Sequence, residues 1–423
     1  MAASPFPPVV ALDVGTTKIA CLAGELDEKG KLGKITGTGN APARGMHKGV
    51  VVDIKDASES IRASAAAAGA TEGAGGVFAG VAGAHIVSMN RRVSLDNPNP
   101  DGRVTKAERQ ALLEKLKRVD VSPDLTLIHA LPRQYILDGQ DAVTRPVGMW
   151  ATHIEMEGHL VFGAISSIQN LVAAVEGAGL EVEDIVLEPL ASARACLEKE
   201  ELESGVMLAD IGGGTTDAVI FSGGRLVHSA VLPVGGNHIT RDISVALKVP
   251  LDAAEEIKIN HGHAQSHLVE DIEMARFPVA TAAAGSERTV TFSKKFLARV
   301  IEARVTEIFS LVHKQARESG YLSSIAAGIV LTGGSSQLEG ICGLAEQAMS
   351  LPCRQGTPSN AATVVDIPSN PVYATAVGLI LYGSERIFKR GPGRPAEGST
   401  HSLGLWEEVL AKVKGWFGRQ SKT

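Results

Sequence analysis

Two stretches of the chain, almost two hundred residues apart, carry nearly the same motif, and this duplication limits the possible fold more than any other feature. The first is Asp13-Val14-Gly15-Thr16-Thr17-Lys18, and the second is Asp210-Ile211-Gly212-Gly213-Gly214-Thr215-Thr216-Asp217. Each follows a short apolar run, at residues 9–12 and 206–209. An apolar run that ends in an acid, glycines and threonines indicates a buried strand entering a tight hairpin. We therefore expect one such unit in each half of the chain.

The residues of these hairpins are suited to phosphate. Glycines let the backbone turn sharply and aim several N–H groups at one anion. Asp13 and Asp210, at matching strand ends, can hold Mg²⁺ through its waters. One loop alone fits an ordinary glycine hairpin, but a matched pair predicts a nucleotide whose phosphates are held from both sides of a cleft. The expected phosphate-binding residues are Gly15, Thr16, Thr17, Lys18, Gly212, Gly213, Gly214, Thr215 and Thr216.

Three further positions complete the predicted site. A third glycine turn, Gly333-Gly334-Ser335, follows an expected strand at 327–331 and offers close approach to a sugar. Glu255 and Lys258 lie three residues apart on an expected helix, where they can reach ribose and purine or form a surface salt bridge. Glu188 follows an apolar run and is either a group that positions water or a strand-end carboxylate without a catalytic role.

Length and charge narrow the class of protein. The chain has 423 residues, too many for one core, and its length indicates about three domains or subdomains. A net charge of -6 argues against a nucleic-acid partner. We find neither a secretion signal nor an apolar stretch approaching the roughly 20 residues that span a bilayer. The four cysteines, Cys342 and Cys353 among them, are expected to be free and mostly buried in a reducing cytoplasm.

The chain pattern indicates two insertions into an α/β protein. An alanine-rich helix is expected at residues 57–70. Residues 85–163 differ in composition from the residues before them and include a charged helix at 106–118, which indicates an inserted subdomain. Residues 230–311 are helix-rich and polar, which indicates a second one. The histidines there favour a solvated loop over a metal site, because no acidic or Cys partner stands at helical spacing; they are His261, His263 and His267.

The end of the chain changes character again. Residues 383–402 are basic and rich in Pro and Gly, which predicts a flexible tether. The following segment forms one apolar helical stripe that can lie in a membrane surface, the alternative being a helix packed on the protein itself. Partial burial minus helix ordering leaves about 4–6 kcal/mol, a weak anchor that strengthens when many copies are joined. The stripe contains Leu403, Trp406, Val409, Leu410, Val413, Trp416 and Phe417.

The order of phosphate loop, connecting strand, second phosphate loop and adenosine loop resembles the superfamily of actin, heat-shock chaperones and sugar kinases. Within it, further stretches are similar to the bacterial cell division protein FtsA family. The resemblance covers roughly residues 9–383 and the terminal helix. The stretches that carry it are residues 41–49, 80–86, 131–135, 146–149, 254–258, 261–262 and 327–334.

The resemblance implies an actin-like, two-domain α/β fold with duplicated ribonuclease H-like cores, inserted subdomains and a C-terminal amphipathic helix. The insertion at 85–163 would replace a subdomain of actin in a different place. The implied boundaries are subdomain 1A at 9–84, 164–205 and 361–383, subdomain 1C at 85–163, subdomain 2A at 206–235 and 306–360, subdomain 2B at 236–305, a linker at 384–402 and a membrane-targeting helix at 403–420.

The resemblance also implies ATP with Mg²⁺ at the loops, acting as an assembly ligand with at most weak hydrolysis. The chain would form actin-like filaments, bind anionic lipid on the cytoplasmic face of the membrane at the division site, anchor the FtsZ ring there and recruit later division proteins. The FtsZ C-terminal tail would dock on the second insertion at Arg304 and Glu307. Arg288, Lys294 and Lys295 either steer that acidic tail or are ordinary exposed charges.

Two other functions fit the same superfamily. A small-molecule kinase would require a substrate pocket with a catalytic acid near the first phosphate loop, and the sequence offers no convincing one. A chaperone ATPase would require a large C-terminal peptide-binding domain, for which the chain is too short. The tail departs from the family pattern because it is longer and bears two of the three tryptophans, so the reach of the tether is not implied by the resemblance.

Overall fold

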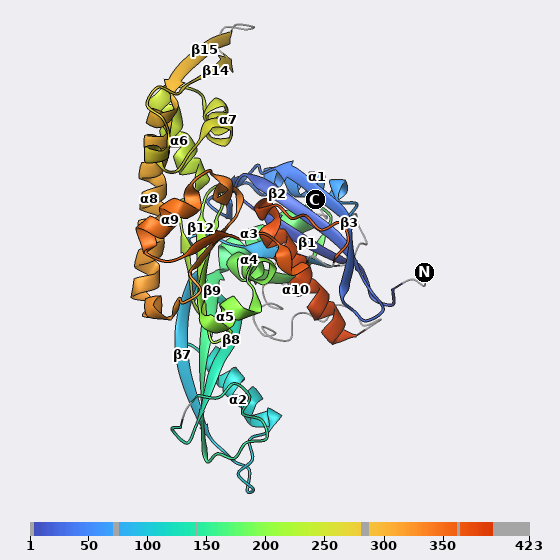
Figure 1. The fold of residues 1–423 in the computed structure, drawn as a ribbon. Helices are drawn as coiled ribbons and strands as arrows, with labels where there is room; N and C mark the ends of the chain where they lie inside the picture. Colours follow the sequence, from blue (N-terminus) through green and yellow to red (C-terminus); the bar gives the residue numbers. More distant parts are fainter. Residues whose placement is uncertain (1–3, 71–75, 141, 281–286, 362–363, 392–423) are drawn as a thin grey trace.

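Two five-stranded sheets form the centre of the molecule in the computed structural model, which describes residues 4–70, 76–140, 142–280, 287–361 and 364–391 (Figure 1). In the first sheet the strand order is β10-β6-β1-β2-β3, and in the second it is β13-β12-β11-β16-β17. The strands of the first are β1 (Val9–Val14), β2 (Lys18–Leu26), β3 (Leu32–Pro42), β6 (Gly76–Val81) and β10 (Glu181–Leu187). Those of the second are β11 (Val206–Ile211), β12 (Thr216–Ser222), β13 (Arg225–Leu232), β16 (Ile329–Thr332) and β17 (Cys353–Gln355).

The two sheets have the same topology. β1 pairs antiparallel with β2 and parallel with β6. β11 likewise pairs antiparallel with β12 and parallel with β16. We call the part of the chain built on the first sheet the first lobe and the part built on the second sheet the second lobe. The repeated topology confirms the predicted α/β fold with a duplicated core.

The helices lie in layers on the two faces of each sheet, because apolar side chains alternate between the faces of a strand. On β1, Val10 and Leu12 face a core shared with two outer helices, whereas Val9 and Ala11 face the core between the sheets. The outer helices of the first lobe are α1 (Ile54–Ala67) and α3 (Ile165–Gly177), and those between the sheets are α4 (Glu188–Cys196) and α10 (Ala374–Arg390). The outer face of the second sheet is covered by α6 (Gly236–Leu247), α7 (Leu251–His261), α8 (Lys294–Glu318) and α9 (Ile341–Met349).

The first insertion is a three-stranded sheet in the order β7-β9-β8, with one helix on it. It projects from the lobes at one end of the molecule, as the lower part of Figure 1 shows. The charged helix expected there is confirmed, with Thr105 and Glu108 forming its capping box. These elements are β7 (Val87–Asp96), α2 (Lys106–Lys117), β8 (Leu125–Leu137) and β9 (His153–Ala164).

A partly buried polar seam joins this insertion to the second lobe. Ser88 Oγ donates to the Ser229 carbonyl at 2.7 Å, and Asn90 Nδ2 donates to the Val227 carbonyl at 3.1 Å. The His159 ring lies 2.8 Å from Asn90 Oδ1 and 2.9 Å from Ser229 Oγ. Burial lowers the pKa of His159 to about 3, so the imidazole is neutral. The insertion leaves the chain between β6 and β10 of the first lobe, yet it is hydrogen-bonded to β13 of the second.

The second insertion lies at the opposite end of the molecule, where Figure 1 shows a two-stranded hairpin above α6 and α7. That hairpin is β14 (Met274–Ala280) with β15 (Glu287–Ser293). The small remaining elements are β4 (Met46–His47), β5 (Val50–Val51), α5 (Lys199–Ser204), η1 (Ser266–Leu268), η2 (Leu322–Ser324), η3 (Gly334–Gln337), η4 (Ser359–Ala361) and η5 (Pro371–Tyr373).

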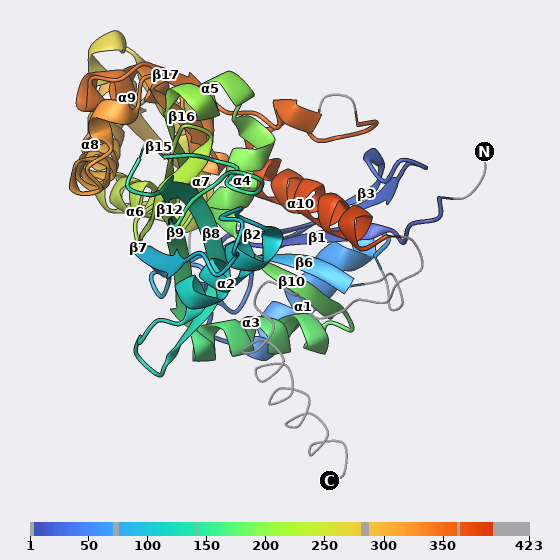
Figure 2. The same cartoon turned by 90° about the horizontal axis from the view of Figure 1, so that it is seen from below.

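Two predicted boundaries were wrong. The helix expected at residues 57–70 begins three residues earlier, because Asp53 caps it by accepting from the Asp56 N–H, and it ends before Gly69, whose φ of +70° stops it. Residues 384–390, expected in the linker, are the last turns of α10, which crosses the molecule in Figure 2. Arg386 holds this end of α10 to the first sheet by its ion pair with Asp184 at 3.0 Å.

Contact between α4 and α10 leaves no room for a side chain at Gly378. An added Cβ would lie 1.8 Å from the Ala191 carbonyl oxygen. We expect Gly378→Ala to lower the free energy of unfolding by about 1–3 kcal/mol, although alanine favours a helix. Denaturant unfolding measures this. Gly343→Ala in α9 is the matched control, because its Cβ would meet the movable end of Gln265; equal losses in both variants would contradict the assigned packing.

Candidate functional site

The two glycine hairpins touch each other across a cleft between the lobes. The first joins β1 to β2, and the second joins β11 to β12. A Cβ added at Gly213 would lie 2.4 Å from Thr17 Cγ2, and one added at Gly214 would lie 2.5 Å from Thr16 Oγ1. Thr16 Oγ1 also accepts from the Gly49 N–H at 2.9 Å. Glycine is therefore required in the second hairpin by the close approach of the first.

Both hairpins line a cavity of about 860 Å³. Almost all residues predicted to bind nucleotide and metal line it, as does Glu188. Thr216 is the exception. It is fully buried, and its hydroxyl donates to the Val234 carbonyl at 2.8 Å. As the first residue of β12 it points to the other side of the strand from Thr215 and Asp217. The prediction that Thr216 presents its side chain to phosphate was therefore wrong.

Four carboxylates converge on this cavity: Asp13, Glu188, Asp210 and Asp217. Burial raises the pKa of Asp13 to about 7, partly opposed by Lys18 and reinforced by Asp210. Burial, with the charges of the neighbouring acids, raises the pKa of both Glu188 and Asp217 well above the usual value. The site is therefore short of positive charge and holds protons at neutral pH.

Lys18 is the cation beside these acids. Its Nζ donates to the Val372 carbonyl at 3.1 Å and lies 4.2 Å from the centre of the Tyr373 ring. Burial lowers the pKa of Lys18. These two contacts come from the segment before α10, more than three hundred residues away in sequence, and they hold the ammonium group at the mouth of the first hairpin.

Asp210 is fixed by a neighbouring helix on each side. Its Oδ2 accepts from Ser192 Oγ of α4 at 2.7 Å and from Thr375 Oγ1 of α10 at 3.2 Å. Burial raises the pKa of Asp210, and both hydroxyl donors oppose that rise. On the adjacent strand, the Asp217 Oδ1 atom is buried and makes no hydrogen bond within the described residues. A buried carboxylate oxygen without a donor is suited to accept from a bound water or a hydrated cation.

Glu188 is the first residue of α4 and directly follows β10. The Leu187 N–H donates to His129 Nε2 of β8 at 3.0 Å, so the first insertion holds the backbone beside Glu188. Burial lowers the pKa of His129 to about 4 and keeps this nitrogen an acceptor. On the opposite side, the Glu188 side chain packs against Gly80, where a Cβ would lie 2.9 Å from its Cγ. Its carboxyl group is thereby held at the cavity wall.

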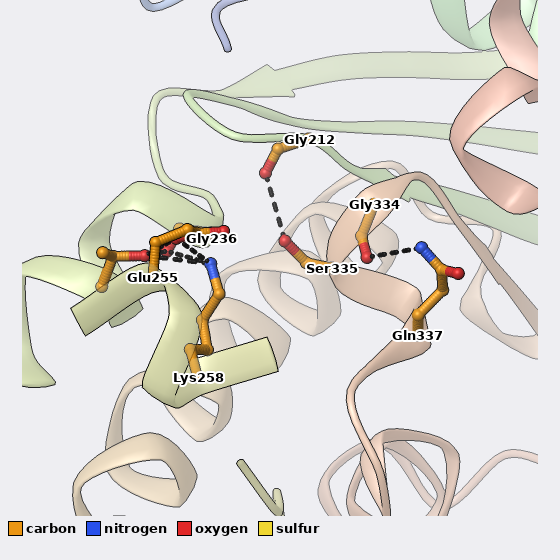
Figure 3. Close-up of polar contacts among 8 residues, drawn as sticks. Gly212, Gly236, Glu255, Lys258, Gly334, Ser335 and Gln337 are labelled. Atoms are coloured by element: carbon orange, nitrogen blue, oxygen red, sulfur yellow. Dashed lines mark hydrogen bonds and ion pairs between the residues drawn. The ribbon is translucent and has the colours of Figure 1, made fainter. Parts of the chain in front are cut away.

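The far end of the cavity is built by α7, α6 and η3, as Figure 3 shows. Lys258 Nζ contacts Glu255 at 2.7 Å, Thr240 Oγ1 at 2.9 Å and the Gly236 carbonyl at 3.3 Å. The i,i+3 salt bridge between Glu255 and Lys258 therefore forms. Lys258 also binds two residues of α6, so the pair is not an isolated salt bridge on the surface. The polar cluster is a candidate for binding a ribose or a base.

The η3 turn approaches the same cavity from the other side. Ser335 Oγ donates to the Gly212 carbonyl at 3.4 Å (Figure 3). Gly333 has a φ of +82°, and a Cβ there would lie 2.3 Å from Asp210 Oδ1. Gly334 faces open space apart from Val372. The turn therefore requires glycine at 333 for its backbone conformation. At Gly334 the backbone is open, so a ligand can approach it.

No three His, Cys, Asp or Glu side chains gather closely enough to ligate a metal directly within the described ranges. The expectation of a solvated loop was wrong for His261, which ends α7 and lies against the Phe277 and Phe292 rings. His263 Nδ1 accepts from the Gln265 N–H at 3.0 Å.

The residues predicted to dock a peptide lie on the second insertion, and all have partners. Arg304 contacts the Asp242 carboxylate at 2.6 and 3.1 Å and pairs with Glu307. Arg288 donates to the Lys248 carbonyl at 3.0 Å. Two more, Lys294 and Lys295, are ion-paired to Glu273 and Asp271.

The predicted membrane helix at 403–420 lies outside the described residues. Among the helices that the structure does describe, none is both long and apolar enough to cross a bilayer.

Several cavity residues were not predicted. Asp217 stands in the second motif but was given no role. Gly49 ends a stretch that supported only the family resemblance, and Gly236 and Thr375 come from segments without a recognisable motif. Asp217 had a usable signal, because it lies two residues after Thr215 and alternation places both on one face of β12. The others reach the site only through the tertiary fold.

Comparisons with known proteins identify the relatives of this chain. A family model described as "Cell division protein FtsA" matches residues 207–378, and one described as "SHS2 domain inserted in FTSA" matches residues 83–162. The chain is 38% identical to the cell division protein FtsA of Pseudomonas aeruginosa over 96% of this chain and 97% of that protein. It is 32% identical to the FtsA of Escherichia coli K12, over 97% and 98% respectively.

Solved structures share the fold at lower identity. A PilM-PilN type IV pilus biogenesis complex matches with a TM-score of 0.62 and 17% identity, over 89% of this chain and 98% of that one. MreB5 of Spiroplasma citri bound to ADP matches with a TM-score of 0.56 and 16% identity, over 92% and 100%. The same protein bound to AMPPNP gives a TM-score of 0.54 and 16% identity, over 91% and 97%. These likenesses establish an actin-like fold.

The raised pKa of Asp13 predicts a dependence of stability on pH. Between its ordinary value of 3.8 and about 7, the folded protein keeps a proton that the unfolded chain has lost. The free energy of unfolding therefore falls as pH rises through this window. We expect Asp13→Asn to be more stable than wild type at about pH 7.5, by an amount on the order of 2 kcal/mol, and the gap to close near pH 4.

Urea unfolding without nucleotide at both pH values measures this. Asp120→Asn, at an exposed aspartate, is the matched control and is expected to change stability equally at both. A gap for Asp13→Asn that does not depend on pH would contradict the assigned burial.

Proposed function

Because the chain belongs to the FtsA family of cell division proteins, we propose that it binds ATP between its lobes and forms actin-like filaments on the inner face of the cell membrane. There it anchors the FtsZ ring and recruits later division proteins. The observation that carries the proposal is the contact of two phosphate-type hairpins at one cavity, in a chain similar to this family over nearly its whole length.

The polar groups of the cavity suit a nucleotide in one orientation. The two hairpins offer N–H groups, threonine hydroxyls and Lys18 at one end, which fits the phosphates. The Glu255–Lys258 pair and the η3 turn stand at the other end, which fits the ribose and base. MreB5 of Spiroplasma citri is bound to ADP in one structure and to AMPPNP in the other, so this fold accepts adenine nucleotides in that protein.

The carboxylates also fit a hydrated Mg²⁺. Asp13 and Asp210 would hold it through its waters, and Asp217 has an unpartnered buried oxygen beside them. The ion would supply positive charge that offsets the crowded acids and the phosphates.

We assign ATP mainly to assembly rather than to turnover. A nucleotide that contacts both hairpins binds the closed arrangement of the lobes more tightly than an open one, and so favours closure. Glu188 is the group placed to orient water, but its pKa is raised well above the ordinary value. The rise favours the protonated form of Glu188, which is a poor base, and this supports slow hydrolysis.

The second insertion carries the features of a peptide-docking surface. Ile272, Met274 and Phe296 are exposed apolar side chains there, with Ile272 85% exposed. Lys294 and Lys295 lie beside Phe296 at the start of α8, and Arg304 lies further along the same helix. Apolar anchors next to basic groups suit an acidic, partly apolar peptide, and we assign this surface to the FtsZ C-terminal tail.

Membrane attachment is assigned to residues 403–420, with anionic lipid as the partner. The structure narrows the basic residues available to lipid, because Arg386 and Arg390 in α10 are ion-paired to Asp184 and Glu183. Electrostatic attraction is therefore assigned to the charges after α10, and filament formation supplies the high effective concentration that a weak helix needs.

Lys18 tests the nucleotide assignment. Lys18→Ala removes the cation at the first hairpin and leaves the acids, so ATP affinity is expected to fall tenfold or more, the loss of about 1.5–3 kcal/mol for a charged hydrogen bond. Calorimetric titration of MgATP measures the change. Lys34→Ala, an exposed lysine on β3 of the same sheet, is the control and should bind as wild type. Equal affinities in all three proteins would overturn the assignment.

Co-sedimentation with anionic vesicles and FtsZ separates the two surface assignments. Removing residues 403–423 is expected to leave both proteins in the supernatant while MgATP binding persists. Arg304→Glu is expected to keep the chain on vesicles but to lose FtsZ, because the docking charge is reversed. Lys314→Glu makes the same reversal at the far end of α8, on an exposed residue, and should keep both proteins on vesicles. Vesicle binding that survives the truncation would contradict the membrane assignment.

A further inference from the structure

Two of the four cysteines, distant from any motif, meet on the surface of the second lobe. Cys342 is the second residue of α9, and Cys353 is the first residue of β17. Both are half-buried and free. Their thiols are hydrogen-bonded to each other. All four cysteines are free; the expectation of mostly buried thiols holds for Cys21 and Cys196, whereas Cys342 and Cys353 are half-buried.

The backbone fixes the approach of the two thiols. Cys342 and Glu346 are four residues apart on α9 and so share one face of the helix. Glu346 Oε1 accepts from the Cys353 N–H at 3.0 Å. The carboxylate thus holds the start of β17 against the helix face that carries Cys342. This packing of β17 against α9 brings the two cysteines together.

The two sulfurs are not equivalent. The Cys353 thiol hydrogen bond lowers the pKa of Cys342, which favours its thiolate. The same hydrogen bond raises the pKa of Cys353. Burial raises the pKa of Cys21 and of Cys196 to about 12, so these two stay inert. Cys342 also lies in the first turn of α9, where the helix N-terminus favours a thiolate. We therefore assign Cys342 as the nucleophile of this half-buried pair and Cys353 as the second thiol.

We propose that Cys342 and Cys353 form a redox site that peroxide converts to an intramolecular disulfide. The Cys342 thiolate attacks one peroxide oxygen, so that an S–O bond forms, the O–O bond breaks and the leaving hydroxide takes a proton to become water. The Cys353 sulfur then attacks Cys342, so that the S–S bond forms, the S–O bond breaks and the departing hydroxide takes the Cys353 proton. Two thiols lose two electrons and two protons, and the peroxide becomes two waters.

The position of the pair gives the disulfide a structural consequence. The bond would join the start of α9 to β17, and η3 directly precedes α9 in the chain. Gln355 Nε2 of β17 donates to the Ser336 carbonyl of η3 at 2.8 Å. Oxidation would therefore restrain the turn that we assign to adenosine. That last step rests on the proposed function, whereas disulfide formation itself does not.

Peptide mass spectrometry of the full-length protein tests the proposal. After treatment with hydrogen peroxide, we expect a peptide pair linked through Cys342 and Cys353, which dithiothreitol separates, while Cys21 and Cys196 stay free until the protein is unfolded. Free or over-oxidised thiols at 342 and 353, without the linked pair, would overturn the proposal, as would a link between molecules. None of these readouts requires nucleotide to bind.

Single variants test the assigned roles of the two sulfurs. Cys353→Ser removes the resolving thiol, so Cys342 is expected to accumulate as a sulfenic acid that a dimedone reagent labels. Cys342→Ser removes the nucleophile, so the label is expected to be lost. Circular dichroism before peroxide treatment confirms that both variants fold. Equal labelling of the two variants would contradict the assignment of Cys342 as the attacking thiol.

Discussion

The contact between the two glycine hairpins determines the rest of the site. Thr16 and Thr17 of one hairpin occupy the space that side chains at Gly213 and Gly214 would fill. Each hairpin leaves a buried strand that carries an acid near its end, so bringing the hairpins together also brings the acids together. The shape of the cleft and its excess of negative charge therefore have the same cause.

The excess of negative charge in the cleft accounts for the contacts that Lys18 and Asp210 make. Lys18 is held by a backbone carbonyl and an aromatic ring rather than by one carboxylate, which leaves its charge directed at the cleft. Asp210 takes hydroxyl donors from both helices that lie between the sheets. Burial raises the pKa values of Asp13, Glu188 and Asp217, so protons hold the cleft below its full negative charge.

The local motifs made the core of the site predictable, because glycine turns after apolar runs are determined by neighbouring residues. The direction of each side chain was harder to predict. Thr216 belongs to the motif, but the pleat of β12 turns its side chain toward Val234. Contacts between residues far apart in the sequence could not be predicted from local patterns. Arg386 and Asp184, 202 residues apart, make residues 384–390 helical where composition alone indicated a linker. The pairing of Cys342 with Cys353 was hidden for the same reason, since it depends on how α9 packs against β17.

The polar seam along β13 gives the first insertion two attachments. Its covalent roots are in the first lobe, while Ser88, Asn90 and His159 bind the second. A rigid body attached on both sides of a hinge cannot stay still when the hinge turns, so any rotation of the lobes must either slide the seam or swing the insertion. Because the insertion, with α2 on its lower part, projects away from the lobes (Figure 1), a small rotation at the cleft would become a larger displacement at its far end. In such a rotation the insertion would act as a lever arm.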